Sequence, residues 1–224
     1  MHLAQVLLGA ACLVSAAGCG RGQHHHMSER HHEHQFDDAE RSAQRWNDPE
    51  RDLWQRPSQV IALMNVEPGM TVADLGAGTG YFEPHLSAAV GTHGKVLALD
   101  ASPQMIEYLK TSDRTSSLTN VEARLVPGDD PQLPDGGIDR LLVVNTWHHI
   151  SDRIVYGRKL RKCLAPGGAV VVVDFEPDAP EGPPAHMRLS APQVVSELKA
   201  AGLDARILEE SLPRQYVVMA SAAP

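Results

Sequence analysis

The chain has 224 residues, of which 42% are hydrophobic and 21% charged, a composition typical of a soluble globular protein. This length allows one domain of about 100–200 residues and a short additional segment. With 18 Gly and 16 Pro, collagen-like and wholly disordered chains are excluded. The net charge of -8 has the wrong sign for a surface that neutralises nucleic-acid phosphates. We therefore expect no nucleic-acid partner.

The N-terminal 18 residues have the pattern of a secretion signal. They carry no charged side chain, and the apolar run at residues 6–14 is followed by small residues and Cys19. This apolar run is shorter than the ~20 residues that a membrane-spanning helix needs. Residues 1–18 are therefore interpreted as a signal peptide. The AAGC sequence resembles a bacterial lipobox, which implies a lipidated Cys19 that anchors the protein to a membrane, facing the periplasm or exterior. Translation from Met27 is the alternative, and it predicts a cytoplasmic protein.

Residues 19–35 show no apolar periodicity and are interpreted as a His-rich flexible tether. Clustered imidazoles can bind Ni, Cu or Zn ions, but without a rigid frame such binding is weak. The cysteines are too few and scattered for a four-cysteine zinc site, so no residue is assigned as a metal ligand. The six tether histidines are His24, His25, His26, His31, His32 and His34.

Ordered structure is expected from Phe36 onward. Residues 36–56 are interpreted as an N-terminal helical segment, because Phe36, Ala39, Ala43 and Trp46 mark one helical face. Asp48 and Pro49 are typical of the start of a second helical turn. The main domain is expected at residues 57–224.

The main domain alternates between strand and helix patterns. Apolar, β-rich runs are separated by segments with apolar residues at helical spacing, an alternation that predicts a parallel sheet with helices on both faces. The fold class is α/β, with a Rossmann-like, mostly parallel sheet of seven strands. The last helix is expected to begin after Ser190 as N-cap and to end at Gly202. The strands are predicted at residues 71–75, 95–99, 121–126, 140–145, 169–174, 205–209 and 215–220.

The strongest chemical signal is the sequence TVADLGAGTGYF at residues 71–82. A strand runs into Asp74, and Gly76, Gly78 and Gly80 form a tight turn before a helix, which lets backbone N–H groups approach a polar ligand. A dinucleotide fingerprint would place its third glycine at position 81, which is Tyr81. The pyrophosphate-binding spacing is therefore not met.

This GxGxG spacing, with Asp74 two residues before its first glycine, resembles motif I of the class I S-adenosylmethionine-dependent methyltransferases. Asp100 lies twenty residues after Gly80, at the end of the second strand, where the resemblance implies hydrogen bonds to the ribose hydroxyls. Asp129 and Asp130 match the acidic position that holds the adenine amino group. The sequences IDRLLVVNTWHHI, at residues 138–150, and LAPGG, at residues 164–168, follow in the same order. Together these motifs resemble the subgroup of ubiquinone and menaquinone biosynthesis methyltransferases.

The resemblance implies S-adenosylmethionine as cofactor and a small-molecule methyl acceptor. Asp74 either stabilises the glycine turn or contacts the methionine part of the cofactor. Tyr81 either contacts the cofactor or lies on a helix face. Either Asp129 or Asp130 is expected to bind the adenine amino group. The candidate cofactor-binding residues are Asp74, Gly76, Ala77, Gly78, Gly80, Tyr81, Asp100, Ala101, Met105, Asp129, Asp130 and Asn145.

Three histidines outside the tether are candidate catalytic residues. His148 and His149 follow the fourth strand, and His186 lies in the proline-rich loop after the fifth. Loops at the carboxyl ends of parallel strands bind ligands, so each could remove a proton from an acceptor. The sequence is also compatible with two functions other than catalysis. The protein would then be a non-catalytic S-adenosylmethionine- or nucleoside-binding lipoprotein, or a tethered metal-binding protein.

Overall fold

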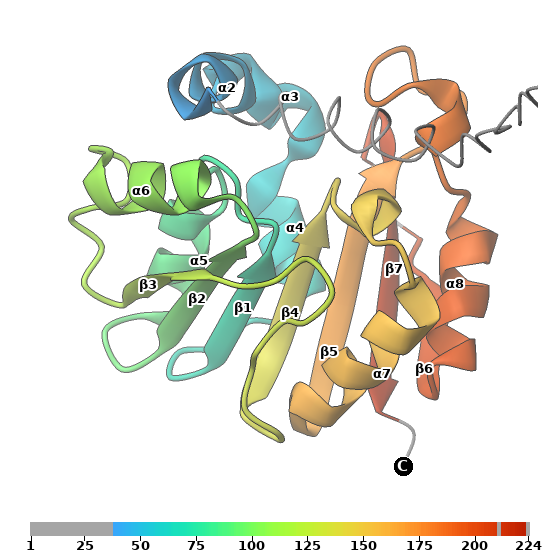
Figure 1. The fold of residues 1–224 in the computed structure, drawn as a ribbon. Helices are drawn as coiled ribbons and strands as arrows, with labels where there is room; N and C mark the ends of the chain where they lie inside the picture. The colour runs from blue at the N-terminus through green and yellow to red at the C-terminus, as the bar shows by residue number, and fades with distance from the viewer. Residues whose placement is uncertain (1–37, 210–211, 223–224) are drawn as a thin grey trace, which may run out of the picture. The chain divides into compact units, whose positions relative to one another are not determined.

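The computed structural model describes residues 38–209 and 212–222 (Figure 1). The predicted signal peptide, the tether with Cys19 and Phe36 lie outside these residues. The described helices are α2 (Ala39–Trp46), η1 (Pro49–Arg51), α3 (Asp52–Gln55), α4 (Pro57–Leu63), α5 (Glu83–Val90), α6 (Pro103–Thr111), η2 (Trp147–His149), α7 (Arg153–Cys163), η3 (Ala185–Met187) and α8 (Ala191–Ala200). The strands are β1 (Thr71–Leu75), β2 (Lys95–Asp100), β3 (Val121–Leu125), β4 (Ile138–Val144), β5 (Leu164–Phe175), β6 (Leu203–Ile207) and β7 (Gln215–Ala222).

These strands form one seven-stranded sheet in the order β3-β2-β1-β4-β5-β7-β6. The first five strands are parallel, and β7 pairs antiparallel with β5 and β6. The predicted α/β class and the mostly parallel seven-stranded sheet are confirmed. Because the chain reverses its strand order at β1, the carboxyl ends of β1, β2 and β4 meet at one edge, the position where open α/β sheets bind ligands.

Helices cover both faces of the sheet, as the patterns predict (Figure 1). Tyr156 and Leu160 of α7 pack with Val194 of α8 in one apolar core. Val60 of α4 and Leu86 of α5 pack in the core on the other face. Within the described ranges, no helix is long and apolar enough to cross a membrane.

The central strands are buried on both faces, which explains their continuous apolar sequence. The predicted cap of α8 is also present, since the Ser190 hydroxyl accepts a hydrogen bond from the Gln193 N–H at 3.4 Å. Several strand boundaries differ from the prediction by one or two residues, and the largest difference is at β5, which begins at Leu164 rather than at Ala169. A Cβ at Gly168 would lie 2.7 Å from the Ile138 oxygen, so only glycine lets this irregular strand start approach β4.

Candidate functional site

The turn after β1 has the backbone that its glycines predict. Gly76, Gly78 and Gly80 all have positive φ, at 77°, 57° and 81°. A Cβ would lie 2.2 Å from the Thr146 hydroxyl at Gly76, and 2.6 Å from a Thr115 methyl at Gly80. At Gly78 the nearest atom would be a Trp46 ring carbon at 3.5 Å. Both the conformation and the close packing therefore require glycine at Gly76 and Gly80.

Asp100, at the end of β2, faces this turn. Its Oδ2 accepts a hydrogen bond from the Gly78 N–H at 2.8 Å, and its Oδ1 accepts one from the Ser102 N–H at 2.9 Å. Burial raises the pKa of Asp100, and the backbone N–H groups oppose that rise. The cap of α6 is Ser102, whose hydroxyl accepts from the Met105 N–H. Asp100 thus links the glycine turn to the start of α6, while the Met105 side chain is buried and Ala101 is exposed.

Asp129 and Asp130, which follow β3, have different surroundings. The Asp130 carboxylate accepts from the Gln132 N–H at 2.9 Å and from Lys159 Nζ at 3.0 Å, and these contacts lower its pKa. The Asp129 side chain is exposed and makes no hydrogen bond to any residue in the described part of the chain. Of the two carboxylates, Asp129 is therefore the one available to a ligand.

Behind the glycine turn lie two buried carboxyl groups. Asp74, on β1, is 3% exposed and Glu83, the first residue of α5, is 0% exposed. Burial, as the largest cause, raises the pKa of Asp74 to about 7 and that of Glu83 well above its usual value. Glu83 is absent from the residues that the motif predicts. Its position three residues after Gly80 is the only sequence feature that could have drawn attention to it.

The N-terminal helical segment packs over the turn (Figure 1). Asn47 and Thr79 exchange two hydrogen bonds, at 3.0 and 3.1 Å. The Tyr81 hydroxyl donates to the Asp52 carboxylate, and the Arg51 guanidinium lies 3.8 Å from the centroid of the Tyr81 ring. Tyr81 therefore holds this covering segment, which the sequence patterns did not connect with the site.

A chain of amide side chains joins the covering segment to the end of β4. Gln55 Nε2 donates to Gln215 Oε1 at 2.5 Å, and Gln215 Nε2 donates to Asn145 Oδ1 at 2.7 Å. Gln55 and Gln215 are 0% and 1% exposed. Asn145, predicted within the fourth strand, instead adopts a φ of 52° just after it, so its side chain is held at the strand end.

The predicted catalytic histidines occupy three different environments. His148 lies in η2, with Nδ1 2.8 Å from the Asp174 carboxylate and both side chains 2% exposed. His149 is exposed, and its ring is tilted by 43° against that of His148, with the centroids 4.2 Å apart. His149 is the last residue of η2, and α7 starts only at Arg153. His186 is exposed in η3. Of the three, His148 is the buried one, and it contacts the Asp174 carboxylate.

Trp147 fixes the position of η2. Its ring is fully buried and its Nε1 donates to Glu197 of α8 at 2.9 Å. Arg153 donates two hydrogen bonds to the same carboxylate, at 2.8 and 2.9 Å. Because this network anchors η2 from the α8 side, His148 is directed toward the end of β5, where Asp174 lies.

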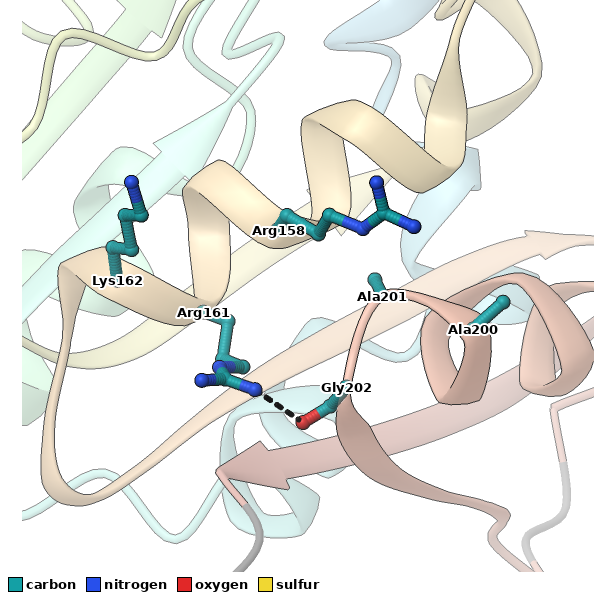
Figure 2. Close-up of a pocket in the computed structure, with 6 residues that line it drawn as sticks. All are labelled: Arg158, Arg161, Lys162, Ala200, Ala201 and Gly202. Atoms are coloured by element: carbon teal, nitrogen blue, oxygen red, sulfur yellow. Dashed lines mark hydrogen bonds between the residues drawn. The ribbon is translucent and has the colours of Figure 1, made fainter.

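A separate hollow lies between the ends of α7 and α8 and is lined by Arg158, Arg161 and Lys162 with residues 200–202. Figure 2 shows the Arg161 guanidinium turned toward Gly202, whose oxygen it contacts at 3.4 Å, while Arg158 and Lys162 point elsewhere. The three cations do not converge on a common point. This hollow contains none of the strand-end residues described above.

The strand-end residues fit a ligand with an adenosine and an amino-acid part. The turn offers backbone N–H groups, Asp100 and Asp129 offer carboxylates at the ends of neighbouring strands, and Glu83 is a buried polar side chain whose oxygens meet no donor among the described residues. The fold and these residues therefore suit a nucleoside-type ligand at the carboxyl edge of the sheet.

Comparison with known proteins finds similarity to methyltransferases over part of the chain. Residues 72–168 match the family described as "Methyltransferase domain". Demethylmenaquinone methyltransferase from Staphylococcus aureus is 34% identical over 124 residues, which are 54% of this chain and 49% of the relative. The protein of the same name from Staphylococcus epidermidis is 33% identical over the same shares of both chains. The chain thus spans about half the length of these curated relatives.

Solved structures extend the likeness beyond the matched segment. A SAM-dependent methyltransferase from Aquifex aeolicus is 28% identical with a TM-score of 0.75, covering 82% of this chain and 97% of that one. A methyltransferase of Haloferax volcanii, solved with its Trm112 activator, is 20% identical with a TM-score of 0.66 and shares the fold. The family match and the similarity to the Aquifex aeolicus structure imply S-adenosylmethionine as the cofactor.

Proposed function

We propose that this chain transfers a methyl group from S-adenosylmethionine to a small-molecule acceptor. The observation that carries this proposal is that the glycine turn with Asp100 and the buried His148–Asp174 pair lie at the same edge of the sheet. The first group of residues suits the cofactor and the second suits proton transfer. A fold alone does not determine a function, so the proposal depends on this convergence of side chains.

S-adenosylmethionine, when bound, supplies a methyl carbon on a sulfonium, whose leaving group is already activated. The residues of this chain therefore have mainly to align the acceptor, a contribution worth ~7–11 kcal/mol in well-oriented reactions. Where the acceptor arrives protonated, His148 Nε2 accepts its proton while Nδ1–H donates to Asp174. This arrangement needs no other base.

The acceptor itself is proposed only as a small molecule. The relatives named for demethylmenaquinone match this chain over about half of their length. The loop at residues 177–188, which follows β5 at the sheet edge, lies outside the family match at residues 72–168. Since loops after the strands form the ligand-binding edge, we do not carry the quinone acceptor over to this chain.

Calorimetry of the full chain with S-adenosylmethionine and S-adenosylhomocysteine tests the proposal. We expect saturable binding of both, followed by release of S-adenosylhomocysteine when small-molecule acceptors are screened. Absence of binding to either compound by the folded protein would refute the assignment. Binding of both compounds with no turnover across an acceptor screen would favour the non-catalytic binding protein instead.

The location of the protein is a separate proposal that rests on the N-terminal sequence. A lipidated Cys19 would attach the domain to a membrane and place it on the periplasmic or exterior side. S-adenosylmethionine is made in the cytoplasm, so this location requires an external supply of the cofactor. Translation from Met27 removes that requirement and is the competing proposal.

A further inference from the structure

The exposed side of α7 carries a cluster of cations that the site at the strand ends does not use. Residues 153–163 hold five of the chain's 20 Lys and Arg residues and no Asp or Glu. Arg153 is paired with Glu197 at 2.8 Å. Lys159 is paired with Asp130 at 3.0 Å. The other three cations are exposed and form no ion pair with any residue that the structure describes: Arg158, Arg161 and Lys162.

Two aliphatic side chains lie on the same side of the helix. Ile154 is 36% exposed and Val155 is 43% exposed. Because successive residues of an α-helix are about 100° apart around its axis, these two and the three unpaired cations fall within about a third of its circumference. Tyr156 and Leu160 lie on the other side, in the core. The exposed side is called the basic face of α7, and it consists of Ile154, Val155, Arg158, Arg161 and Lys162.

The structure of the chain itself explains only part of this face. The helix dipole favours cations in the last turn of a helix, which accounts for Arg161 and Lys162. It does not account for Arg158, one turn earlier. The core does not account for Ile154 and Val155, which lie outside it. The combination therefore points to contact with something outside the chain.

The pattern of the basic face is typical of a helix that lies on a lipid headgroup surface, where cations alternate with aliphatic side chains. The three cations do not converge, as the binding of a single phosphate group would require. A membrane presents many anionic groups, so each cation can meet a separate one. The net charge of -8 disfavours a nucleic acid in the same position.

The hollow beside Arg161 leaves room for a headgroup. It has a volume of about 360 Å³, and Figure 2 shows the three cations on its α7 side and the small residues 200–202 on the other. Since α7 packs on a face of the sheet rather than over its carboxyl edge, a membrane on this side leaves the strand-end residues open to their ligands.

We propose that the basic face of α7 docks on an anionic lipid surface. The lipid phosphates pair with the three cations, while Ile154 and Val155 enter the boundary between the headgroups and the acyl chains. The proposal is independent of methyl transfer. It applies equally to a chain that is anchored through Cys19 and to one that begins at Met27.

Co-sedimentation of the full chain with vesicles tests this inference. The chain carries Cys19→Ser, which prevents lipidation, and the vesicles are phosphatidylcholine alone or an equimolar mixture with phosphatidylglycerol. The apolar run at residues 6–14 contributes to both kinds of vesicle alike, so the preference for the anionic ones measures the effect of charge. A chain with a net charge of -8 and no basic face would be repelled by them.

We expect a preference for the anionic vesicles of at least about tenfold, because each Lys or Arg near an anionic surface strengthens binding about fivefold. The preference should disappear at about 1 M salt, where the Debye length falls to ~3 Å. Ile154→Ser combined with Val155→Ser should weaken binding severalfold without any change of charge.

Two triple variants separate the basic face from the overall charge. The first replaces the three cations of the basic face by Gln and should lose the preference for anionic vesicles. The second is the matched control and removes three exposed cations of α2 and α6, with Arg41→Gln, Arg45→Gln and Lys110→Gln. It has the same net charge and should keep the preference. If the first variant does not fold, Arg158→Glu against Lys110→Glu gives the same comparison.

Three results would overturn the inference. The wild-type chain shows no preference for anionic vesicles, or the two triple variants lose it equally, which would reflect overall charge alone. In the third, duplex DNA binding is lost in the basic-face variant while vesicle binding is unchanged, which would indicate a nucleic-acid partner. Binding of S-adenosylmethionine is measured separately, and none of these results bears on it.

Discussion

The Asp174 carboxylate orients the imidazole of His148. Oδ2 of Asp174 lies 2.8 Å from His148 Nδ1, and Oδ1 accepts the Phe175 N–H at 2.9 Å, so both carboxylate oxygens are engaged. With its proton on Nδ1, the ring presents Nε2 as an acceptor. Among the three histidines expected to act on the acceptor, this orientation favours His148 as the base.

Replacing His148 by Gln should separate catalysis from cofactor binding. Loss of a general base lowers turnover by ~10²–10⁴, while the affinity for S-adenosylmethionine should stay nearly unchanged. Turnover is measured with the acceptor found by screening, and affinity by calorimetry. His186→Gln, on the exposed η3, is the matched control and should retain wild-type turnover. Full activity of the His148 variant would mean that His148 is not a general base, and that alignment of the acceptor with the methyl group accounts for the rate.

The acidic residues at the strand ends should differ in their importance for the cofactor. Hydrogen bonds to charged groups are worth ~1.5–3 kcal/mol, so Asp100→Ala should weaken S-adenosylmethionine binding at least about tenfold. Asp129→Ala should also weaken it. Asp130→Ala should change it little, because Lys159 and the Gln132 N–H already occupy that carboxylate. Calorimetry on variants with wild-type circular dichroism measures this order, and an unchanged affinity in Asp100→Ala would disprove the ribose contact.

The sheet and the glycine turn were predictable because their signals are local. Buried parallel strands read as continuous apolar runs, and β1 begins and ends at the predicted residues. The turn was visible because Gly76 and Gly80 occupy positions that no other residue fits. Such features depend on the backbone and its immediate neighbours in the sequence.

The polar pairs were not predictable, because they join residues from separate elements. His148 and Asp174 are 26 residues apart on neighbouring strand ends, and Tyr81 and Asp52 are 29 apart. The sequence shows that Asp174 lies at the end of an apolar strand. It does not show which side chain from the neighbouring strand end lies beside Asp174. The covering segment at α2 and α3 was likewise read as separate from the turn that it contacts.

The buried carboxyl pair should make stability depend on pH. The pKa of Asp74 rises from 3.8 to about 7 on folding, so the folded protein binds more protons in that range than the unfolded chain. The free energy of unfolding should therefore fall as the pH rises from about 4 to about 7. Chemical denaturation at several pH values measures this slope. Glu83→Gln should flatten it and Glu107→Gln, the same change at an exposed glutamate of α6, should not. Equal slopes in all three proteins would contradict the pair's contribution.

The proposed lipid anchor can be tested directly by mass spectrometry. If Cys19 is lipidated, membrane fractions should contain a mature chain with a diacylated N-terminal Cys19, detectable by mass spectrometry. Cys19→Ser should move the protein to the soluble fraction. A mature N-terminus at Met1 or Met27 in the cytosol would contradict the anchor and favour the internal start.

The amide chain from Gln55 through Gln215 to Asn145 should couple the covering segment to the sheet edge. Removing one partner of a buried hydrogen bond leaves the other unsatisfied, at a cost of ~1–3 kcal/mol. Gln55→Leu and Gln215→Leu should each lower the free energy of unfolding by about that amount. The double variant should lose less than the sum, because the bond between the two amides is then removed only once. Urea denaturation of the four proteins gives the coupling energy. Strictly additive losses would mean that the 2.5 Å contact between Gln55 and Gln215 does not hold the covering segment in place.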